Sequence, residues 1–242
     1  MWLIALILGG VCWVVSARGD EPDDLLQEPA KYPLATEREI ADALRPRTPA
    51  EALARLMAGN ARFAAGKAIH PDAGQPWREG LVAGQHPFVT LLGCSDSRVS
   101  PTVIFDQGLG DMFVVSDAGN VVDPEVAGSI EYAVDYLHTP LVMVLGHESC
   151  GAITAALAER AHYHAEPADL TALLDDIAPA LVDVPTNIGQ AEQVARGVEE
   201  NVRLSVQRLC ELPDLAAAIE QGQIEVRGAI YNLETGRVRL LD

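Results

Sequence analysis

The stretch "LVMVLGHESCGA", residues 141–152, begins as an uninterrupted apolar run and ends in a histidine, an acid and a cysteine. Short apolar runs of this kind are typical of strands that are buried on both faces of a parallel sheet. Two earlier runs, "FVTLLG" (88–93) and "DMFVVS" (111–116), have the same character. The three runs therefore predict the central strands of a mainly parallel sheet.

Helical patterns alternate with these runs. Thr48 resembles an N-cap before Pro49, and Asp123 is a plausible cap with Pro124 at the first helical position. Further helix-like segments lie at 150–161, 168–181, 188–210 and 213–222, and the end of the chain resembles a strand pair that turns near Thr235-Gly236.

The alternation of strand and helix predicts an α/β fold, a mainly parallel β-sheet flanked by helices. With 242 residues and no internal repeat, the chain is best explained by a single catalytic domain over 49–242.

Two segments precede that domain. Residues 1–17 contain no charged side chain and end in Val15-Ser16-Ala17, a pattern compatible with signal-peptide cleavage. We expect a signal peptide or, alternatively, an uncleaved N-terminal anchor over residues 1–17; either places the domain outside the cytoplasm, as a periplasmic or secreted protein. Residues 18–48 are acidic and Pro-rich, which is typical of an arm or linker with little core of its own.

The formal net charge of −18 argues against nucleic acid as a partner, because phosphates would be repelled. A membrane is expected as a partner only through the N-terminal segment, if it stays uncleaved. The composition fits a globular protein that acts on a small molecule.

Metal-ligating side chains follow two of the predicted strands. Cys94 comes directly after the first run, and His147 and Cys150 follow the third. In parallel α/β sheets, ligands bind beyond the carboxyl ends of the strands, so these side chains converge if the two strands are neighbours. Two thiolates and one imidazole are good zinc ligands, and three protein ligands leave the fourth position open, as in catalytic zinc sites.

Other interpretations of the same residues stay open. His147 could be a hydrogen-bonded histidine and the cysteines buried thiols. Cys94 and Cys150 could form a redox disulfide, although that role leaves His147, Asp96 and Arg98 unexplained. Cys94 could also be a nucleophile, but the segment from Cys94 to Arg98 is shorter than the loop with which a cysteine phosphatase wraps a phosphate. Cys210 is expected to pack within a helix.

The chain resembles the β-class carbonic anhydrases. The resemblance rests on "GCSDSRV" (93–99), "AGN" (118–120) and "GHESCGA" (146–152), in this order and spacing, and covers residues from about 49 to 242. It implies reversible hydration of carbon dioxide to bicarbonate and a proton, with one zinc ion per subunit. It also implies a homodimer, or an assembly of dimers, with the site at the subunit boundary.

The resemblance assigns roles to individual residues. It implies that Cys94, His147 and Cys150 hold the zinc and that Asp96 and Arg98 are the catalytic dyad. It places a substrate-binding glutamine, which reaches across the dimer interface, at Gln85. The backbone N–H of Gly119 is a second candidate for holding a substrate oxygen.

Two features depart from the family. Ser116-Asp117 stand where the family usually carries Arg-Asn, and Leu91 stands where part of the family has a tryptophan. In that part of the family the arginine and the tryptophan help to hold a non-catalytic bicarbonate, so we do not expect inhibition of that type here.

Two other functions remain possible at this point: a hydrolase of carbonyl sulfide or carbon disulfide on the same scaffold, and a non-catalytic zinc-binding relative. The proton carrier has no assignment beyond three candidate histidines, His138, His162 and His164.

Overall fold

The computed structural model describes residues 5–8, 11–14, 45–159 and 167–242. The chain divides into two units, Met1–Ala43 and Leu44–Asp242. In the first unit, strand β1 (Ala5–Leu8) pairs antiparallel with β2 (Val11–Val14). Most of the predicted arm, residues 18–44, lies outside the described residues. Among the helices that the structure describes, none combines the length and the apolar character needed to cross a membrane.

The second unit is built on a five-stranded sheet with the order β4-β3-β5-β6-β7. The strands are β3 (Val89–Cys94), β4 (Met112–Asp117), β5 (Leu141–His147), β6 (Glu225–Tyr231) and β7 (Val238–Leu240). All neighbouring pairs are parallel except β6 and β7, which are antiparallel. The predicted fold, a mainly parallel sheet flanked by helices, is confirmed, and the three apolar runs are its adjacent strands β4, β3 and β5.

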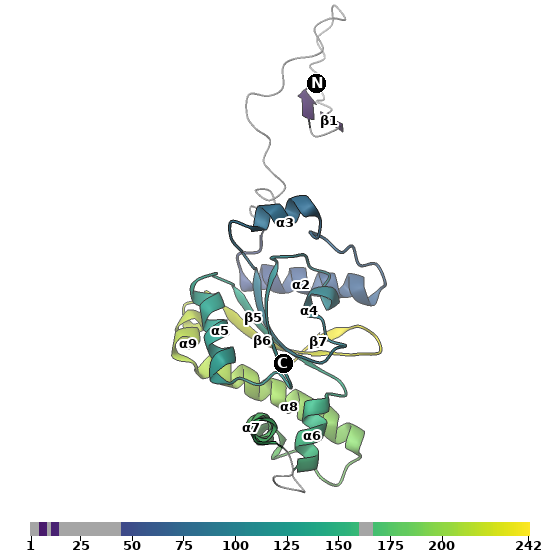
Figure 1. Ribbon diagram of the computed structural model, residues 1–242, viewed down its shortest axis with the longest axis vertical. Coiled ribbons are helices and arrows are strands. Elements are labelled where there is room, and N and C mark those ends of the chain that lie inside the picture. Colours follow the sequence, from purple (N-terminus) through teal and green to yellow (C-terminus); the bar gives the residue numbers. More distant parts are fainter. Residues whose placement is uncertain (1–4, 9–10, 15–44, 160–166) are drawn as a thin grey trace, which may run out of the picture. The chain divides into compact units, whose positions relative to one another are not determined.

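The helices that pack around this sheet follow the predicted alternation (Figure 1). They are α2 (Pro49–Ala64), α3 (Gln75–Leu81), α4 (Pro101–Ile104), α5 (Pro124–Asp135), α6 (Gly151–Glu159), α7 (Ala168–Ile177), the 3-10 turn η1 (Ala178–Leu181), α8 (Gln190–Glu211) and α9 (Pro213–Glu220). The sequence patterns did not predict α3 and α4, which are short and carry little periodic signal.

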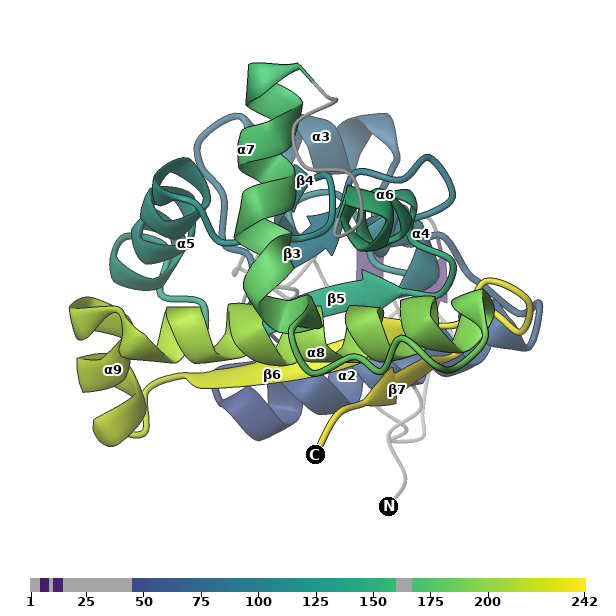
Figure 2. The same cartoon turned by 90° about the horizontal axis from the view of Figure 1, so that it is seen from below.

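Both faces of the sheet are covered, as the apolar runs require. Along β5, Val142 and Val144 belong to a core with α5, α6, α7, α8 and α9, whereas Met143 and Leu145 belong to a second core with α2 and α4. This alternation follows from the two-residue period of a strand. Figure 2 shows α8 and α2 on opposite sides of the sheet.

The helix starts are set by local capping. The Thr48 side chain accepts a hydrogen bond from Glu51 N, and the Glu51 carboxylate accepts one from Thr48 N, a complete capping box before Pro49. The Asp123 side chain caps α5 by accepting from Val126 N at 2.7 Å. Both predicted caps are therefore confirmed.

A buried carboxylate ties α2 to the turn after α4. Asp106 has a φ of +47° and a fully buried side chain, and it accepts a hydrogen bond from Arg62 Nε at 2.6 Å. It also accepts bonds from the backbone N–H groups of Ile69 and His70. These bonds cross 36 to 44 positions of the sequence and fix the segment between α2 and α3.

Candidate metal centre

The two motifs that carry cysteine and histidine meet at one edge of the sheet. Strands β3 and β5 are adjacent and parallel, with Gly93 opposite Leu145, so their carboxyl ends lie side by side. Cys94 is the last residue of β3, His147 is the last residue of β5, and Cys150 lies just before α6. The expected convergence is thus observed.

The three side chains form a compact, buried cluster. One ligand atom from each of Cys94, His147 and Cys150 lies within 4.8 Å of the others, and the residues are 4%, 0% and 2% exposed. The two sulfur atoms are 4.0 Å apart. Two thiolates bound to one zinc at about 2.3 Å each would lie about 3.8 Å apart in a tetrahedral site, so the spacing fits that metal.

His147 is oriented for metal binding. Its Nδ1 lies 2.9 Å from the carbonyl oxygen of Glu148, so Nδ1 carries the proton and donates it there. Its Nε2 then presents a lone pair, and this atom is buried without a hydrogen-bond partner among the described residues. A buried nitrogen without a partner is costly, and a metal ion would satisfy it.

The cysteines are free thiols. Cys94, Cys150 and Cys210 make no disulfide among the described residues, and 4.0 Å between Cys94 Sγ and Cys150 Sγ is far beyond a bond of about 2.05 Å. A hydrogen bond from Cys150 and the nearby His147 and Gly119 N–H lower the pKa of the Cys94 thiol, against the effect of burial. The hydrogen bond with Cys94, followed by burial, raises the pKa of the Cys150 thiol. Two thiolates buried 4.0 Å apart would repel each other, so a cation is needed for both cysteines to be deprotonated.

Asp96 and Arg98 form a fork-like ion pair beside this cluster. Arg98 Nε donates to Asp96 Oδ1 at 2.9 Å, and Arg98 Nη2 donates to Asp96 Oδ2 at 2.7 Å. These bonds hold the pKa of Asp96 far below its usual range, so it is a carboxylate at neutral pH. Its Oδ2 lies 3.8 Å from His147 Nε2, which places an acceptor beside the metal-binding atoms.

Arg98 also links the two motifs. Its Nη2 donates to the carbonyl oxygen of Ser149 at 3.3 Å, within the turn between His147 and Cys150. Ser149 has a φ of +54°, a left-handed conformation that is uncommon outside glycine. The guanidinium thus holds both the carboxylate of one motif and the backbone of the other.

The carboxyl end of β4 lies beside Cys94. Asp117 pairs in register with Cys94, and both its carboxylate oxygens are buried without a hydrogen-bond partner in the described part of the chain. Burial, followed by the nearby charges of Asp123 and Cys94, raises the pKa of Asp117 to about 7. Ser116, at the position of the family's arginine, is exposed.

The remaining predicted residues are placed as follows. The Gly119 N–H donates to Cys94 Sγ at 3.3 Å, so in the structure it faces the sulfur. Gln85 is exposed in the segment between α3 and β3. His138 is exposed near the amino end of β5, at the edge of the sheet opposite the cluster, whereas His162 and His164 lie outside the described residues.

Sequence reasoning missed two polar residues behind the site. Asn201 and Ser205 on α8 are each 2% exposed and donate hydrogen bonds to the carbonyl oxygens of Gly119 and Asn120. A signal was present, because both interrupt the apolar stripe that Val194, Val198, Val202 and Leu209 form at helical spacing.

Comparison with known proteins gives a consistent result. Residues 89–238 match the family model described as carbonic anhydrase. The chain is 41% identical over 198 residues to carbonic anhydrase 2 of Mycobacterium tuberculosis, a match that covers 80% of this chain and 93% of that protein. It is 38% identical over 196 residues to a carbonic anhydrase of Mycolicibacterium smegmatis, with 79% and 93% covered.

Solved structures agree with this comparison. The β-carbonic anhydrase CafA of Aspergillus fumigatus superposes with a TM-score of 0.63 at 29% identity and covers 78% of this chain and 90% of its own. A tetrameric β-carbonic anhydrase of Sordaria macrospora superposes with a TM-score of 0.62 at 28% identity, covering 78% and 96%.

Proposed function

Because this chain belongs to the β-carbonic anhydrase family, we propose that it catalyses the reversible hydration of carbon dioxide with one zinc ion held by Cys94, His147 and Cys150. The observation that carries the proposal is the buried cluster itself, in which His147 Nε2 has no hydrogen-bond partner in the described part of the chain. Zinc bound there would activate a water molecule for attack on carbon dioxide near neutral pH.

The residues around the cluster supply orientation. Asp96 is a carboxylate whose Oδ2 lies close to His147 Nε2. It can therefore accept a hydrogen bond from the attacking water and direct a lone pair of the water oxygen toward carbon dioxide. Arg98 holds both oxygens of that carboxylate and keeps it from turning. This arrangement supports a site in which Asp96 orients the water and leaves the metal position open.

The proposal also includes substrate contacts by Gln85 and Gly119. Gln85 is exposed, which is compatible with an amide that reaches the site of a second subunit and holds an oxygen of carbon dioxide or bicarbonate. The tetrameric relative from Sordaria macrospora supports an oligomer. A substrate contact by Gly119 would require its N–H to be shared with Cys94 Sγ.

The test is a stopped-flow carbon dioxide hydration assay on zinc-loaded protein with Asp96→Asn beside it. We expect a fast wild type, and a substituted protein that keeps its zinc but loses at least 10-fold in kcat/KM. A zinc-loaded wild type without acceleration would contradict the function, and an unaffected Asp96→Asn would contradict the role of the dyad. The same proteins assayed with carbonyl sulfide test the hydrolase alternative, which the names of the relatives do not favour.

We also propose that residues 1–17 direct export, on the basis of the uncharged run and the small residues that end it. The domain over 49–242 would then work outside the cytoplasm, as a periplasmic or secreted enzyme, or as an anchored one if the segment is kept. Amino-terminal sequencing of the protein from fractionated cells tests this, and a cytoplasmic protein that still begins at Met1 would contradict export.

A further inference from the structure

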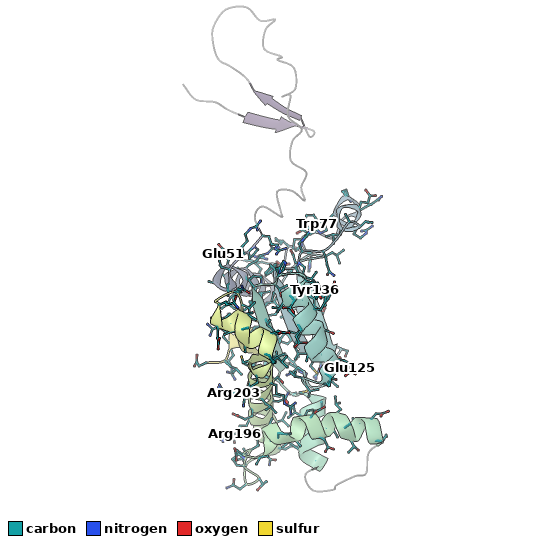
Figure 3. All side chains as sticks on the ribbon, turned by 90° about the vertical axis from the view of Figure 1, so that its left-hand side faces the viewer. Glu51, Trp77, Glu125, Tyr136, Arg196 and Arg203 are labelled. Carbon is teal, nitrogen blue, oxygen red and sulfur yellow. The ribbon has the colours of Figure 1, made fainter. Side chains whose placement is uncertain are left out.

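Helix α8 holds the loop that contacts Cys94. Asn201 Nδ2 donates to the Gly119 carbonyl oxygen at 2.6 Å, and Ser205 Oγ donates to the Asn120 carbonyl oxygen at 2.9 Å. Both side chains are almost fully buried, whereas Arg196 and Arg203 mark the exposed face of the same helix (Figure 3). Two polar groups therefore occupy core positions of α8 and bind the backbone of this loop.

The loop needs such support because its backbone is left-handed at two successive residues. Gly119 has a φ of +83° and Asn120 a φ of +46°. The left-handed conformation is unfavourable for a residue with a side chain, and such conformations persist where the surroundings over-determine them. A Cβ at Gly119 would lie 2.8 Å from Ile177 Cδ1, so the loop is also packed tightly against α7.

What this geometry delivers is one N–H group aimed at sulfur. The Gly119 N–H donates to Cys94 Sγ at 3.3 Å, while the carbonyl on the other side of the same residue is held by Asn201. A hydrogen bond to a thiolate draws negative charge away from the sulfur. At a zinc with two thiolates, that effect matters because the thiolates otherwise neutralise the charge with which the metal activates water.

We propose that Asn201 is a positioning residue: by binding the Gly119 carbonyl, it aims the Gly119 N–H at Cys94 Sγ and limits the charge that this thiolate gives to the metal. The inference rests on the proposed zinc site. Asn201 lies on α8, 107 positions after Cys94 in the sequence. The proposal gives it an effect on the strength of the metal as a Lewis acid.

The test replaces Asn201 by leucine, which has the same branched arrangement of side-chain heavy atoms but no donor, and loads the protein with Co²⁺. Because the Cys94 sulfur would carry more charge, we expect the sulfur-to-cobalt charge-transfer band of Asn201→Leu to move to longer wavelength. We also expect kcat/KM of the zinc form to fall about 10-fold, as is typical for groups that orient a metal ligand.

Thr139→Val is the matched control. Thr139 is fully buried, and its hydroxyl makes a hydrogen bond with the Thr90 hydroxyl at 2.8 Å. The valine variant loses this buried side-chain bond, just as Asn201→Leu loses its bond to the Gly119 carbonyl. It lies at the amino end of β5, away from the cluster. We expect this variant to be less stable with an unchanged band. A wild-type band in fully loaded Asn201→Leu, or an equal shift in Thr139→Val, would overturn the proposal.

A measurement on the unaltered protein covers the case in which Asn201→Leu does not fold. In protein loaded with ¹¹³Cd, the Gly119 amide proton should show a scalar coupling to the metal through Cys94 Sγ. A Gly119 resonance without this coupling would overturn the proposal. Failure of the zinc site is a distinct result, because the wild type would then bind neither Co²⁺ nor Zn²⁺ in stoichiometric amount.

Discussion

Arg98 illustrates how much of the site depends on the shape of one side chain. Its guanidinium makes two parallel bonds to Asp96 and a third to the Ser149 carbonyl. A lysine would keep the charge but offers a single ammonium group, which cannot make the paired bonds. The function of this position therefore depends on the fork geometry as well as on the charge.

We expect Arg98→Lys to lower kcat/KM for carbon dioxide hydration by about 10–100-fold, the usual cost of removing an outer partner of a metal site. The zinc content should stay near one ion per chain, because all three ligands remain. Metal analysis alongside stopped-flow kinetics checks both statements. Full activity in Arg98→Lys would mean that the positive charge alone is sufficient.

Asp106 provides a pH-dependent contribution to stability. Burial alone would raise its pKa, but the hydrogen bonds from Arg62, His70 N and Ile69 N outweigh it and lower the pKa below the ordinary value. A carboxyl whose pKa is lower in the folded state stabilises the fold above its unfolded pKa of about 3.9, and this stability is lost as the pH falls through the folded value.

Asp106→Asn should therefore reduce the free energy of unfolding at pH 7 by about 1–3 kcal/mol, the cost of weakening a buried hydrogen-bonded group. The difference in the free energy of unfolding between variant and wild type should narrow below pH 5, because the wild-type carboxyl then takes up a proton and loses its charge. Urea unfolding at a series of pH values between 7 and 3 measures it. A difference that stays constant over this range would show that the charge of Asp106 contributes nothing.

At the scale of elements, the approach of α2 to the end of α4 depends on one missing side chain. A Cβ at Gly59 would lie 1.8 Å from the carbonyl oxygen of Phe105 and 2.7 Å from Gln107 Nε2. Gly59 is buried, and with Ala52 and Leu56 it forms the face of α2 that packs on the core. Only glycine allows this helix and that turn to approach so closely.

Gly59→Ala is expected to lower the stability by at least about 1–3 kcal/mol, because α2 must move away from a rigid backbone oxygen. Gly128→Ala is the control, since Gly128 is exposed within α5 and a Cβ there meets no described atom within 4 Å. It should raise stability by up to about 1 kcal/mol through helix propensity alone. Thermal unfolding of both variants measures the contrast, and equal effects would contradict it.

At the scale of elements, the sequence could predict features that depend on local patterns but not contacts that depend on tertiary packing. The strands, the Thr48 and Asp123 caps and the meeting of Cys94 with His147 follow from local patterns and from the rule for parallel strand ends. Asn201 and Ser205 could not be assigned in this way, because their partners lie 82 and 85 positions away and only tertiary packing brings them together. The binding of Gly119 N–H to sulfur was missed for the same reason.

For the whole molecule, every candidate site residue lies in the unit Leu44–Asp242. We expect a chain that lacks residues 1–43 to bind one zinc ion and to hydrate carbon dioxide at the rate of the full chain. Metal analysis and kinetics on both proteins test this. Loss of zinc in the shortened chain would show that the first unit contributes to the site.

The distance between the ligands along the chain has a consequence for metal acquisition. Cys94 and Cys150 are 56 positions apart and meet only when β3 and β5 pair, so the unfolded chain holds no preformed trap for the ion. The complete site can therefore select its metal only in the compartment where the chain folds, which need not be the one where it is synthesised. For a protein exported before folding, the ions available outside the cytoplasm would be the ones that compete for the nascent site.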